Sequence, residues 1–168
     1  MTQLLLVRHG ETVDNVNKIM QGQTQGCLTL HGIEQAQDLA RRLAGTHIDA
    51  FVSSDLRRAA DTCAIIARPH NAGIVHTPLL RERDWGSFTG RYIPDLQNAQ
   101  WTDDIETADA MLMRARRFLA FVRSNWPGMT VLAVGHGIMN KAIQSALLGK
   151  PMNQIERMDN AEVRCLTL

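Results

Sequence analysis

The chain has few of the residues that form cross-links or metal sites. Only three cysteines occur, Cys27, Cys63 and Cys165, and they are widely spaced without a CxxC pair. An odd number of scattered cysteines argues against a disulfide framework and a zinc site, and is typical of a reducing compartment. We expect these thiols to be inert packing or surface groups.

The chain also lacks a charge imbalance and a long apolar run. It has 18 basic and 17 acidic residues and a net charge of +1, so no global charge favours nucleic acid or an acidic membrane surface. No apolar run approaches the ~20 residues of a membrane-spanning helix. Residues 4–7 are too short for a signal peptide, because Arg8 follows at once. We therefore expect a cytoplasmic, soluble protein that binds neither nucleic acid nor membrane.

What is present predicts one globular domain over residues 1–168, because 45% hydrophobic residues can bury a substantial core at this length. Short apolar runs alternate with segments of helical periodicity, which predicts an α/β sandwich with a largely parallel sheet. The expected strands are residues 4–7, 50–52, 73–76, 131–134 and 162–168, and the expected helices are residues 29–45, 56–68, 106–125 and 138–148.

Local signals refine these elements. Thr29 is expected to cap its helix, and residues 53–55 to cap the helix that follows them. Residues 81–90 carry glycines without helical periodicity, which indicates a functional loop or irregular strand. Residues 92–104 are the least regular and most polar part, and would suit a short lid or a subunit contact. The residues expected to face the core from helix 106–125 are Leu112, Leu119 and Val122.

Two of the apolar strands end in a histidine followed by glycine, as VRHG at residues 7–10 and VGHG at residues 134–137. Ligands of open α/β sheets bind beyond the carboxyl ends of the strands, so both imidazoles are expected at one edge of the sheet. A neutral His9 can attack phosphorus there while the Arg8 guanidinium holds phosphate oxygens, and a charged His136 would stabilise those oxygens in flight.

Two other interpretations of these histidines compete with phosphoryl transfer. Taken alone, Arg8 could cap a helix and His9 could be a solvated loop residue. A metal site would use the same two imidazoles, but neither lies in an HExxH-type pattern, so we expect no metal. The other four histidines have no comparable context and are expected at the surface: His31, His47, His70 and His76.

A further arginine for an anion pocket is available at the start of the second predicted helix, where the helix dipole also attracts anions. Arg57 and Arg58 are adjacent and point about a quarter-turn apart, so only one is expected to face the site. The alternative is that both are solvated helix residues.

The ordered motifs LLLVRHGETVDN, SSDLRRAADT, LRERDWGSFTG and VGHG, with Gln21-Gly22 and Leu28-Thr29 between the first two, resemble the histidine phosphatase superfamily in its phosphoglycerate mutase-like branch. The resemblance runs through nearly the whole chain. It implies a three-layer α/β/α sandwich and phosphoryl transfer through a phosphohistidine, with no cofactor in the hydrolytic members.

Carried over position by position, the resemblance makes His9 the nucleophile and Glu82 the group that donates and accepts the proton. Asp84, two residues on, is the rival for the role of Glu82, and a working acid there needs a raised pKa. Trp85 either lines the substrate entrance or packs the loop onto the body. The phosphate pocket and substrate contacts implied by the resemblance are Arg8, Asn15, Gln21, Gly22, Arg58, Glu82, His136 and Gly137.

The expected activity is a metal-independent phosphomonoesterase acting on a small phosphorylated metabolite or releasing inorganic phosphate. The alternative is a cofactor-dependent phosphoglycerate mutase, whose family members carry a longer insertion with extra cations after the Glu-bearing segment. Residues 91–104 contain only Arg91 as a cation and three aspartates, which favours hydrolysis. A phosphate-binding module without chemistry is the non-enzymatic alternative. The sequence selects neither a substrate, among sugar phosphates, nucleotide-derived monoesters, α-ribazole phosphate and phosphoproteins, nor a homo-oligomeric state.

Overall fold

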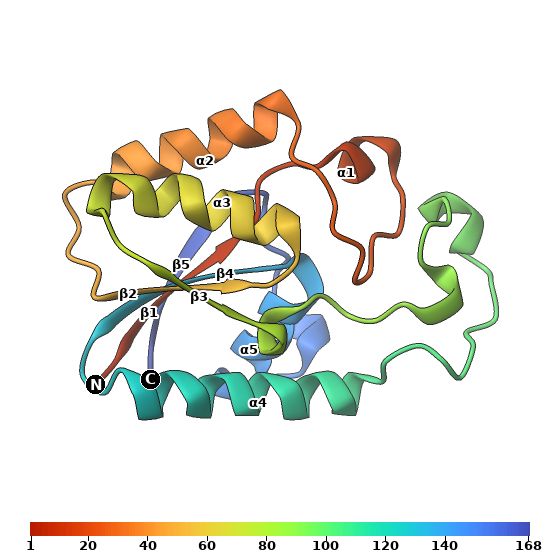
Figure 1. Ribbon diagram of the computed structural model, residues 1–168. Coiled ribbons are helices and arrows are strands. Elements are labelled where there is room, and N and C mark those ends of the chain that lie inside the picture. The colour runs from red at the N-terminus through yellow and green to blue at the C-terminus, as the bar shows by residue number, and fades with distance from the viewer.

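A five-stranded sheet forms the centre of the protein in the computed structural model, which describes all 168 residues (Figure 1). The strand order is β3-β2-β4-β1-β5, and every neighbouring pair is parallel except β1 and β5. The antiparallel β5 closes one edge, as expected for the last segment of the chain. The strands are β1 (Gln3–Arg8), β2 (Ala50–Ser54), β3 (Ile74–Thr77), β4 (Thr130–Gly135) and β5 (Val163–Thr167).

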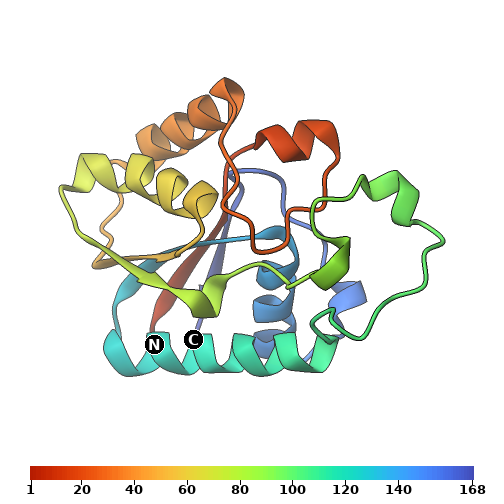
Figure 2. The ribbon, with the colours of Figure 1, turned by 45° about the vertical axis from the view of Figure 1, so that its right-hand side comes forward.

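Helices cover both faces of the sheet, so the predicted three-layer α/β/α sandwich is confirmed. Helices α2 (Leu30–Leu43) and α3 (Arg57–Ala67) lie together on one face, and α4 (Ala108–Asn125) and α5 (Gly137–Leu148) lie on the other (Figures 1 and 2). The short α1 (Val13–Asn17) follows β1 outside these layers. None of the helices combines the length and the apolar character needed to cross a bilayer.

The central strands bury side chains on both faces, which explains their unbroken apolar runs. In β1, Leu4 and Leu6 enter the core beneath α4 and α5, whereas Leu5 and Val7 enter the core beneath α2 and α3. The side chains of β4 alternate in the same way. Burial of each such side chain contributes about 1.5–3 kcal/mol to stability. The two strands therefore hold the residues that follow their carboxyl ends in fixed positions.

Two details of the helices differ from the sequence-based expectation. The N-cap residue of α3, Leu56, has no side-chain cap hydrogen bond; the Ser54 hydroxyl accepts the Leu56 N–H at 3.2 Å, and the first helical N–H, that of Arg57, donates to Oε1 of Gln25, far away in the sequence. In α4, Leu119 and Val122 are buried as expected, but Leu112 is only half-buried and packs at the margin of the core. Met111, Ala115 and Phe118 join Leu119 and Val122 in the buried stripe.

The histidines outside the two His-Gly motifs follow the sequence-based expectation with one exception. His31, His47 and His76 are exposed as expected, but His70 is half-buried with its ring 5.1 Å from that of Phe51. It follows α3 in a 3-10 turn over Arg68–His70, which continues the helix axis and turns the imidazole inward. Among the cysteines, only Cys63 is buried.

The topology brings three strand ends to one edge of the sheet. Strand β1 lies directly beside β4 with Arg8 opposite Gly135, and β2 pairs with the other side of β4. His9 after β1, His136 after β4 and Ser54, the last residue of β2, therefore lie next to one another. The expectation that the two His-Gly strand ends meet is confirmed, because the two imidazole centroids are 5.2 Å apart.

Candidate active site

His9 is held at the end of β1 with one ring nitrogen free. Its backbone N–H donates to the Gly135 carbonyl at 3.1 Å, and its Nδ1 lies 2.7 Å from the carbonyl oxygen of Gly10. Because a carbonyl only accepts, Nδ1 carries the proton and Nε2 keeps a lone pair. Burial, and next the positive charge of Arg58, hold the pKa of His9 well below its usual range. His9 is therefore a neutral base at neutral pH, in the form required of a nucleophile.

The turn after His9 passes so close to α2 that glycine is required. A Cβ built on Gly10 would lie 2.5 Å from the carbonyl oxygen of Gly32 in the first turn of that helix. Gly32 is equally constrained, since its Cβ would lie 2.1 Å from the Glu11 carbonyl oxygen. Thr29 caps the helix by accepting the Gly32 N–H at 2.9 Å, as the sequence predicts. This contact fixes the direction in which the chain leaves the nucleophile.

Of the two adjacent arginines, the structure turns Arg58 into the site and Arg57 away from it. Arg58 is 1% exposed and donates to three backbone carbonyls, at 2.8 Å to Gly22 and also to Thr24 and Gln25. Arg57 is exposed and pairs with Asp61 one turn along the helix. Burial lowers the pKa of Arg58 to about 10, so it stays charged at neutral pH.

Arg8 and His136 complete the inner pocket from the neighbouring strand ends. Arg8 donates to the Met158 carbonyl at 2.6 Å, and burial, with the positive charge of Arg157 next, lowers its pKa to about 10. His136 is fully buried, and its Nε2 lies 2.9 Å from the Ser54 hydroxyl. Burial and then Arg58 hold the pKa of His136 well below its usual range, so this ring is also neutral in the protein alone.

Three buried nitrogen atoms of these residues have no partner within the protein. They are Nε of Arg8, Nε of Arg58 and Nδ1 of His136. Buried donors are almost always paired, and an unpaired one costs about 1–3 kcal/mol. Two of them belong to cations that line the same cavity as His9, and two cations close to one neutral imidazole fit an anion such as a phosphoryl group.

The residues that the resemblance places around the substrate lie in the same cavity. The Asn15 amide oxygen accepts the Thr12 N–H at 3.0 Å and an amide N–H of Asn160 at 3.2 Å. Gln21 is buried against the Thr12 hydroxyl, and Gly22, with a φ of +52°, turns its carbonyl to Arg58. An inner cavity of about 170 Å³ is lined by, among others, Arg8, His9, Asn15, Gln21, Gly22, Arg58, Glu82 and Gly137; His136 lies behind His9.

Glu82 projects into this cavity from the loop after β3. Its carboxylate accepts backbone N–H groups of Arg83 at 2.8 Å, Met139 at 3.0 Å and Ile138 at 3.1 Å. The last two belong to the first turn of α5, whose dipole favours negative charge. These contacts fix the direction of the Glu82 carboxyl group.

A partly buried ion pair holds the loop that carries Glu82. Arg114 of α4 donates to both carboxylate oxygens of Glu106, at 3.0 and 2.8 Å, and to the carbonyls of Leu79, Arg81 and Glu82. Nothing in the spacing of the sequence marked Arg114, because it looks like one of several arginines on an amphipathic helix. The backbone of the catalytic loop is thus clamped from behind.

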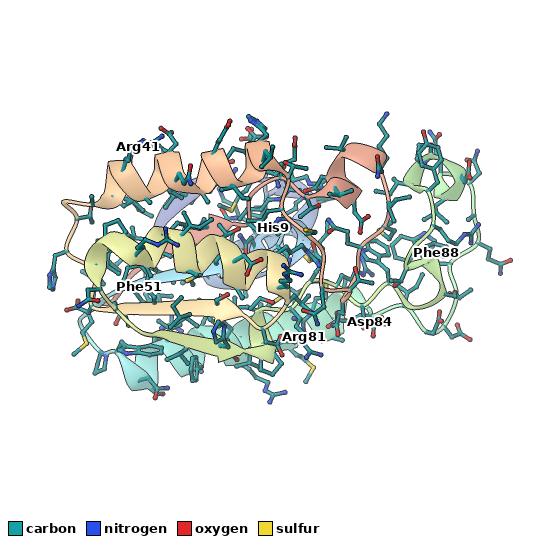
Figure 3. The ribbon with its side chains drawn as sticks, turned by 45° about the horizontal axis from the view of Figure 1, so that its top comes forward. His9, Arg41, Phe51, Arg81, Asp84 and Phe88 are labelled. Carbon is teal, nitrogen blue, oxygen red and sulfur yellow. The ribbon has the colours of Figure 1, made fainter.

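Asp84 does not reach the cavity. Its side chain is exposed and accepts the Gly86 N–H at 2.9 Å, at the base of the segment that projects from the body (Figure 3). Figure 3 shows Asp84 on the stretch leading to Phe88, whereas His9 lies over the sheet. Of the two carboxyl groups, Glu82 is therefore the one placed beside His9.

A second cavity of about 670 Å³ continues outward from the first. Trp85 lines both cavities and lies 5.4 Å from Trp101, ring centroid to ring centroid. The Arg83 guanidinium lies 4.7 Å from the Trp85 ring and 4.8 Å from the Trp101 ring. The two alternatives considered for Trp85 are therefore compatible: its ring packs against the loop residues Arg83 and Trp101, and it also lines both cavities. Residues 92–104 form part of this outer wall.

Arg157 is the charged lining residue that the motifs missed. It lies in the polar stretch between α5 and β5, where no periodicity or motif singles it out, and it lines both cavities. Only the packing of that stretch against the end of β1 brings it to the site.

Comparisons with known proteins agree with this geometry. The family model described as histidine phosphatase superfamily (branch 1) matches residues 4–168. A protein of Proteus mirabilis named "Probable phosphoglycerate mutase GpmB" is 34% identical, with 90% of this chain matched to 77% of that protein.

Solved structures are similar over nearly the whole chain. A mycobacterial glucosyl-3-phosphoglycerate phosphatase in complex with VO3 is 29% identical with a TM-score of 0.90, covering 98% of this chain and 92% of that one. Bacillus stearothermophilus YhfR is 26% identical with a TM-score of 0.94, covering 100% and 92%.

Proposed function

Because this chain belongs to the histidine phosphatase superfamily, we propose that it is a metal-independent phosphomonoesterase that hydrolyses a small phosphorylated metabolite through a phosphohistidine at His9. The observation that carries the proposal is the convergence of two buried guanidinium groups, Arg8 and Arg58, and the Glu82 carboxyl group on the cavity lined by His9, whose Nε2 is free. The two cations suit the oxygens of a phosphoryl group that His9 attacks. One protein of similar structure is a mycobacterial phosphatase, which supports hydrolysis of a phosphate ester as the reaction class.

In the first half-reaction, the lone pair on Nε2 of His9 attacks phosphorus. The bond between phosphorus and the leaving oxygen breaks, and that oxygen takes a proton from the carboxylic acid of Glu82. The guanidinium groups of Arg8 and Arg58 bind the oxygens of the transferring group. The product of this step is phospho-His9 and a free alcohol.

In the second half-reaction, a water oxygen attacks the same phosphorus and the Glu82 carboxylate takes a proton from that water. The phosphorus–nitrogen bond breaks, and His9 recovers its lone pair while inorganic phosphate leaves. Glu82 ends the cycle protonated, as it began.

The protonation state of His136 is also expected to change during this cycle. A phosphoryl dianion beside a buried imidazole favours its protonated form, which opposes the effect of burial and Arg58. His136 would then donate through Nδ1, the nitrogen without a protein partner, to an equatorial oxygen.

A phosphoglycerate mutase is the second candidate, because relatives at 34% identity carry that name. A mutase must keep water away from the phosphohistidine, which mutases of this family achieve with a longer, cation-bearing insertion after the Glu-bearing segment. In this chain the only cation of residues 91–104, Arg91, lies over the Phe88 ring at 5.5 Å and lines neither cavity. The lack of such an insertion favours hydrolysis, whatever other groups the substrate carries. With 3-phosphoglycerate as substrate, faster formation of 2-phosphoglycerate than of inorganic phosphate would establish the mutase instead.

The proposed function is tested with an aryl phosphate in the presence of a strong chelator. We expect turnover by the wild-type protein, loss of at least about 10³-fold in His9→Ala, and no change in the exposed-histidine control His47→Ala. Brief incubation with ³²P-labelled substrate and acid-sparing quenching should leave label on the wild-type protein but not on His9→Ala. Turnover that needs a divalent metal, or that survives in His9→Ala, contradicts the proposal.

A further inference from the structure

Arg157 stands out among the charged residues of the two cavities because the proposed reaction gives it no task. Its Nε and Nη2 lie 3.4 and 3.5 Å from the position that a Cβ on Gly137 would occupy, and Nε of Arg8 lies 3.5 Å from that same position. Two guanidinium groups therefore flank one point at the start of α5. The absence of a side chain at Gly137 leaves that point open.

No acidic group of the protein neutralises Arg157. It takes part in none of the protein's ion pairs, and its side chain makes no hydrogen bond. Its positive charge instead disfavours the charge on Arg8, where it is the second cause, after burial, of the lowered pKa. The charges of Glu82, Asp159 and Glu162 act on Arg8 in the opposite direction. An anion bound between or beside the two guanidinium groups would lower their mutual repulsion further.

The backbone around Arg157 is fixed although its side chain is exposed. Arg164 of β5 donates to the Glu156 carbonyl at 3.0 Å and to the Arg157 carbonyl at 3.5 Å, and Arg8 donates to the Met158 carbonyl. Arg164 is itself anchored by Glu162 at 2.7 Å. The guanidinium is thus delivered to the cavity from a tethered segment, which reduces the entropy lost when it binds a ligand.

The position of Arg157 along the cavity indicates which part of a substrate it meets. It lines the inner cavity that holds His9 and also the outer cavity, where Lys18 is the other cation and Asp14 the acid. A phosphoryl group bound to Arg8 and Arg58 occupies the inner end. The part of the substrate that departs with the alcohol must therefore pass Arg157.

We propose that Arg157 binds a second anionic group, a carboxylate or a second phosphate, on the leaving group of the substrate. The inference rests on the proposed phosphomonoesterase function and narrows its substrate class. The preferred substrates are small phosphomonoesters whose alcohol portion is itself negatively charged a few bonds from the ester oxygen. Arg157 acts on specificity and takes no part in the chemical steps at His9 and Glu82.

The test uses substrates that differ only in the second anion. One pair is ethyl phosphate and phosphoglycolate, and another is phenyl phosphate and 3-carboxyphenyl phosphate; ethylene glycol bisphosphate supplies a second phosphate in place of the carboxylate. Values of kcat/KM are measured for the wild-type protein, Arg157→Met, Arg157→Lys and the control Arg116→Met, an exposed arginine of α4 that lines neither cavity.

We expect the wild-type protein to prefer the doubly anionic member of a pair, and Arg157→Met to lose about ten- to hundredfold in kcat/KM for that member alone. The loss should appear mainly in KM, should be partly restored in Arg157→Lys, and should be absent in Arg116→Met. Whether carboxylate or phosphate loses more identifies the second anion.

Two results would overturn the inference while leaving the phosphatase intact. An equal loss for both members of a pair means that Arg157 binds the transferring phosphoryl group itself, and no loss for either means that it binds nothing. Failure of the proposed function looks different, because the wild-type protein would then hydrolyse none of these esters.

Discussion

The inner and the outer parts of the cavity are built in different ways. In the inner pocket, Arg8, His9 and Arg58 are each at most 7% exposed, and each is tied to backbone carbonyls. In the outer wall, Trp101 is 55% exposed and is held by ring contacts and the Arg83 guanidinium. The inner groups are thus held by main-chain carbonyls, whereas the aromatic part of the outer wall is held mainly by contacts between side chains, with Arg83 also donating to the Glu106 carbonyl at 2.8 Å. The difference implies that substitutions within the pocket change rate and those outside it change substrate preference.

The largest effect is expected from Glu82→Gln, compared with Asp84→Asn two residues away. Glu82→Gln should lower kcat for an alkyl phosphate by about 10²–10⁴-fold, because the alkoxide then leaves without a proton. The loss should be much smaller for p-nitrophenyl phosphate, whose leaving group needs no proton. Asp84→Asn should behave like wild type, since Asp84 lies outside the cavity. Equal losses for both variants would abolish the distinction between the two carboxyl groups.

The next comparison sets Arg58→Met against its neighbour Arg57→Met. Arg58→Met should cost about 10²–10³-fold in kcat/KM for any phosphomonoester, because it removes a preorganised cation from the transferring phosphoryl group. Arg57→Met removes only an exposed pair with Asp61 and should change kcat/KM by less than twofold. Steady-state kinetics with p-nitrophenyl phosphate decides this. A large effect in Arg57→Met would mean that the helix presents the wrong face in the structure.

Acid should destabilise the folded protein through the two histidines of the inner pocket, with no contribution from the outer wall. The pKa values of His9 and His136 are lowered in the folded protein. Below about pH 6.5, both histidines are therefore protonated in the unfolded chain while they remain neutral in the folded protein. Stability is fully present above that pH and falls by about 1.4 kcal/mol per unit for each histidine as the pH decreases. Urea unfolding at pH 7.5 and 5.5 should therefore differ by about 3 kcal/mol from these two groups.

A matched pair of histidine variants separates this effect from general acid sensitivity. His136→Asn should remove about half of the difference between the two pH values, whereas His76→Gln, at an exposed position, should leave it unchanged. Inorganic phosphate should reduce the difference in the wild-type protein, because a bound anion favours the protonated rings. An unchanged difference in His136→Asn would contradict the assigned direction of its pKa.

The smallest effect is expected from the outer wall. Arg83→Met should destabilise the protein by about 1 kcal/mol through loss of its contacts with Trp85 and Trp101. Its kcat/KM for ethyl phosphate should stay within about threefold of wild type, while that for a bulkier ester such as naphthyl phosphate falls further. Exposed Arg123→Met on α4 is the control. A uniform loss for small and bulky esters would show that the wall also shapes the inner pocket.

Much of the fold was accessible from the sequence, because its signals are local. Apolar runs predicted all five strands to within two residues at each end, and alternation of strands with helices predicted the layers. The failures occurred where distant residues compete with local ones. The first helical N–H of α3 donates to Gln25 rather than to residues 53–55, and the core stripe of α4 includes Met111 and Phe118 because the facing sheet sets the rotation of the helix.

The motifs alone carry the chemical groups at the strand ends: an arginine that ends β1 and a histidine after it, a histidine after β4, and a carboxyl group in the loop after β3. These positions are local to their elements, so they can be read from the sequence. Local periodicity left open which of Arg57 and Arg58, and which of Glu82 and Asp84, faces the site; the family resemblance selected Arg58 and Glu82, and the folded chain places these two on the cavity. The tertiary structure alone brought Arg114 behind the catalytic loop and Arg157 to the cavity, since contacts between segments far apart in the chain leave no periodic trace in the sequence.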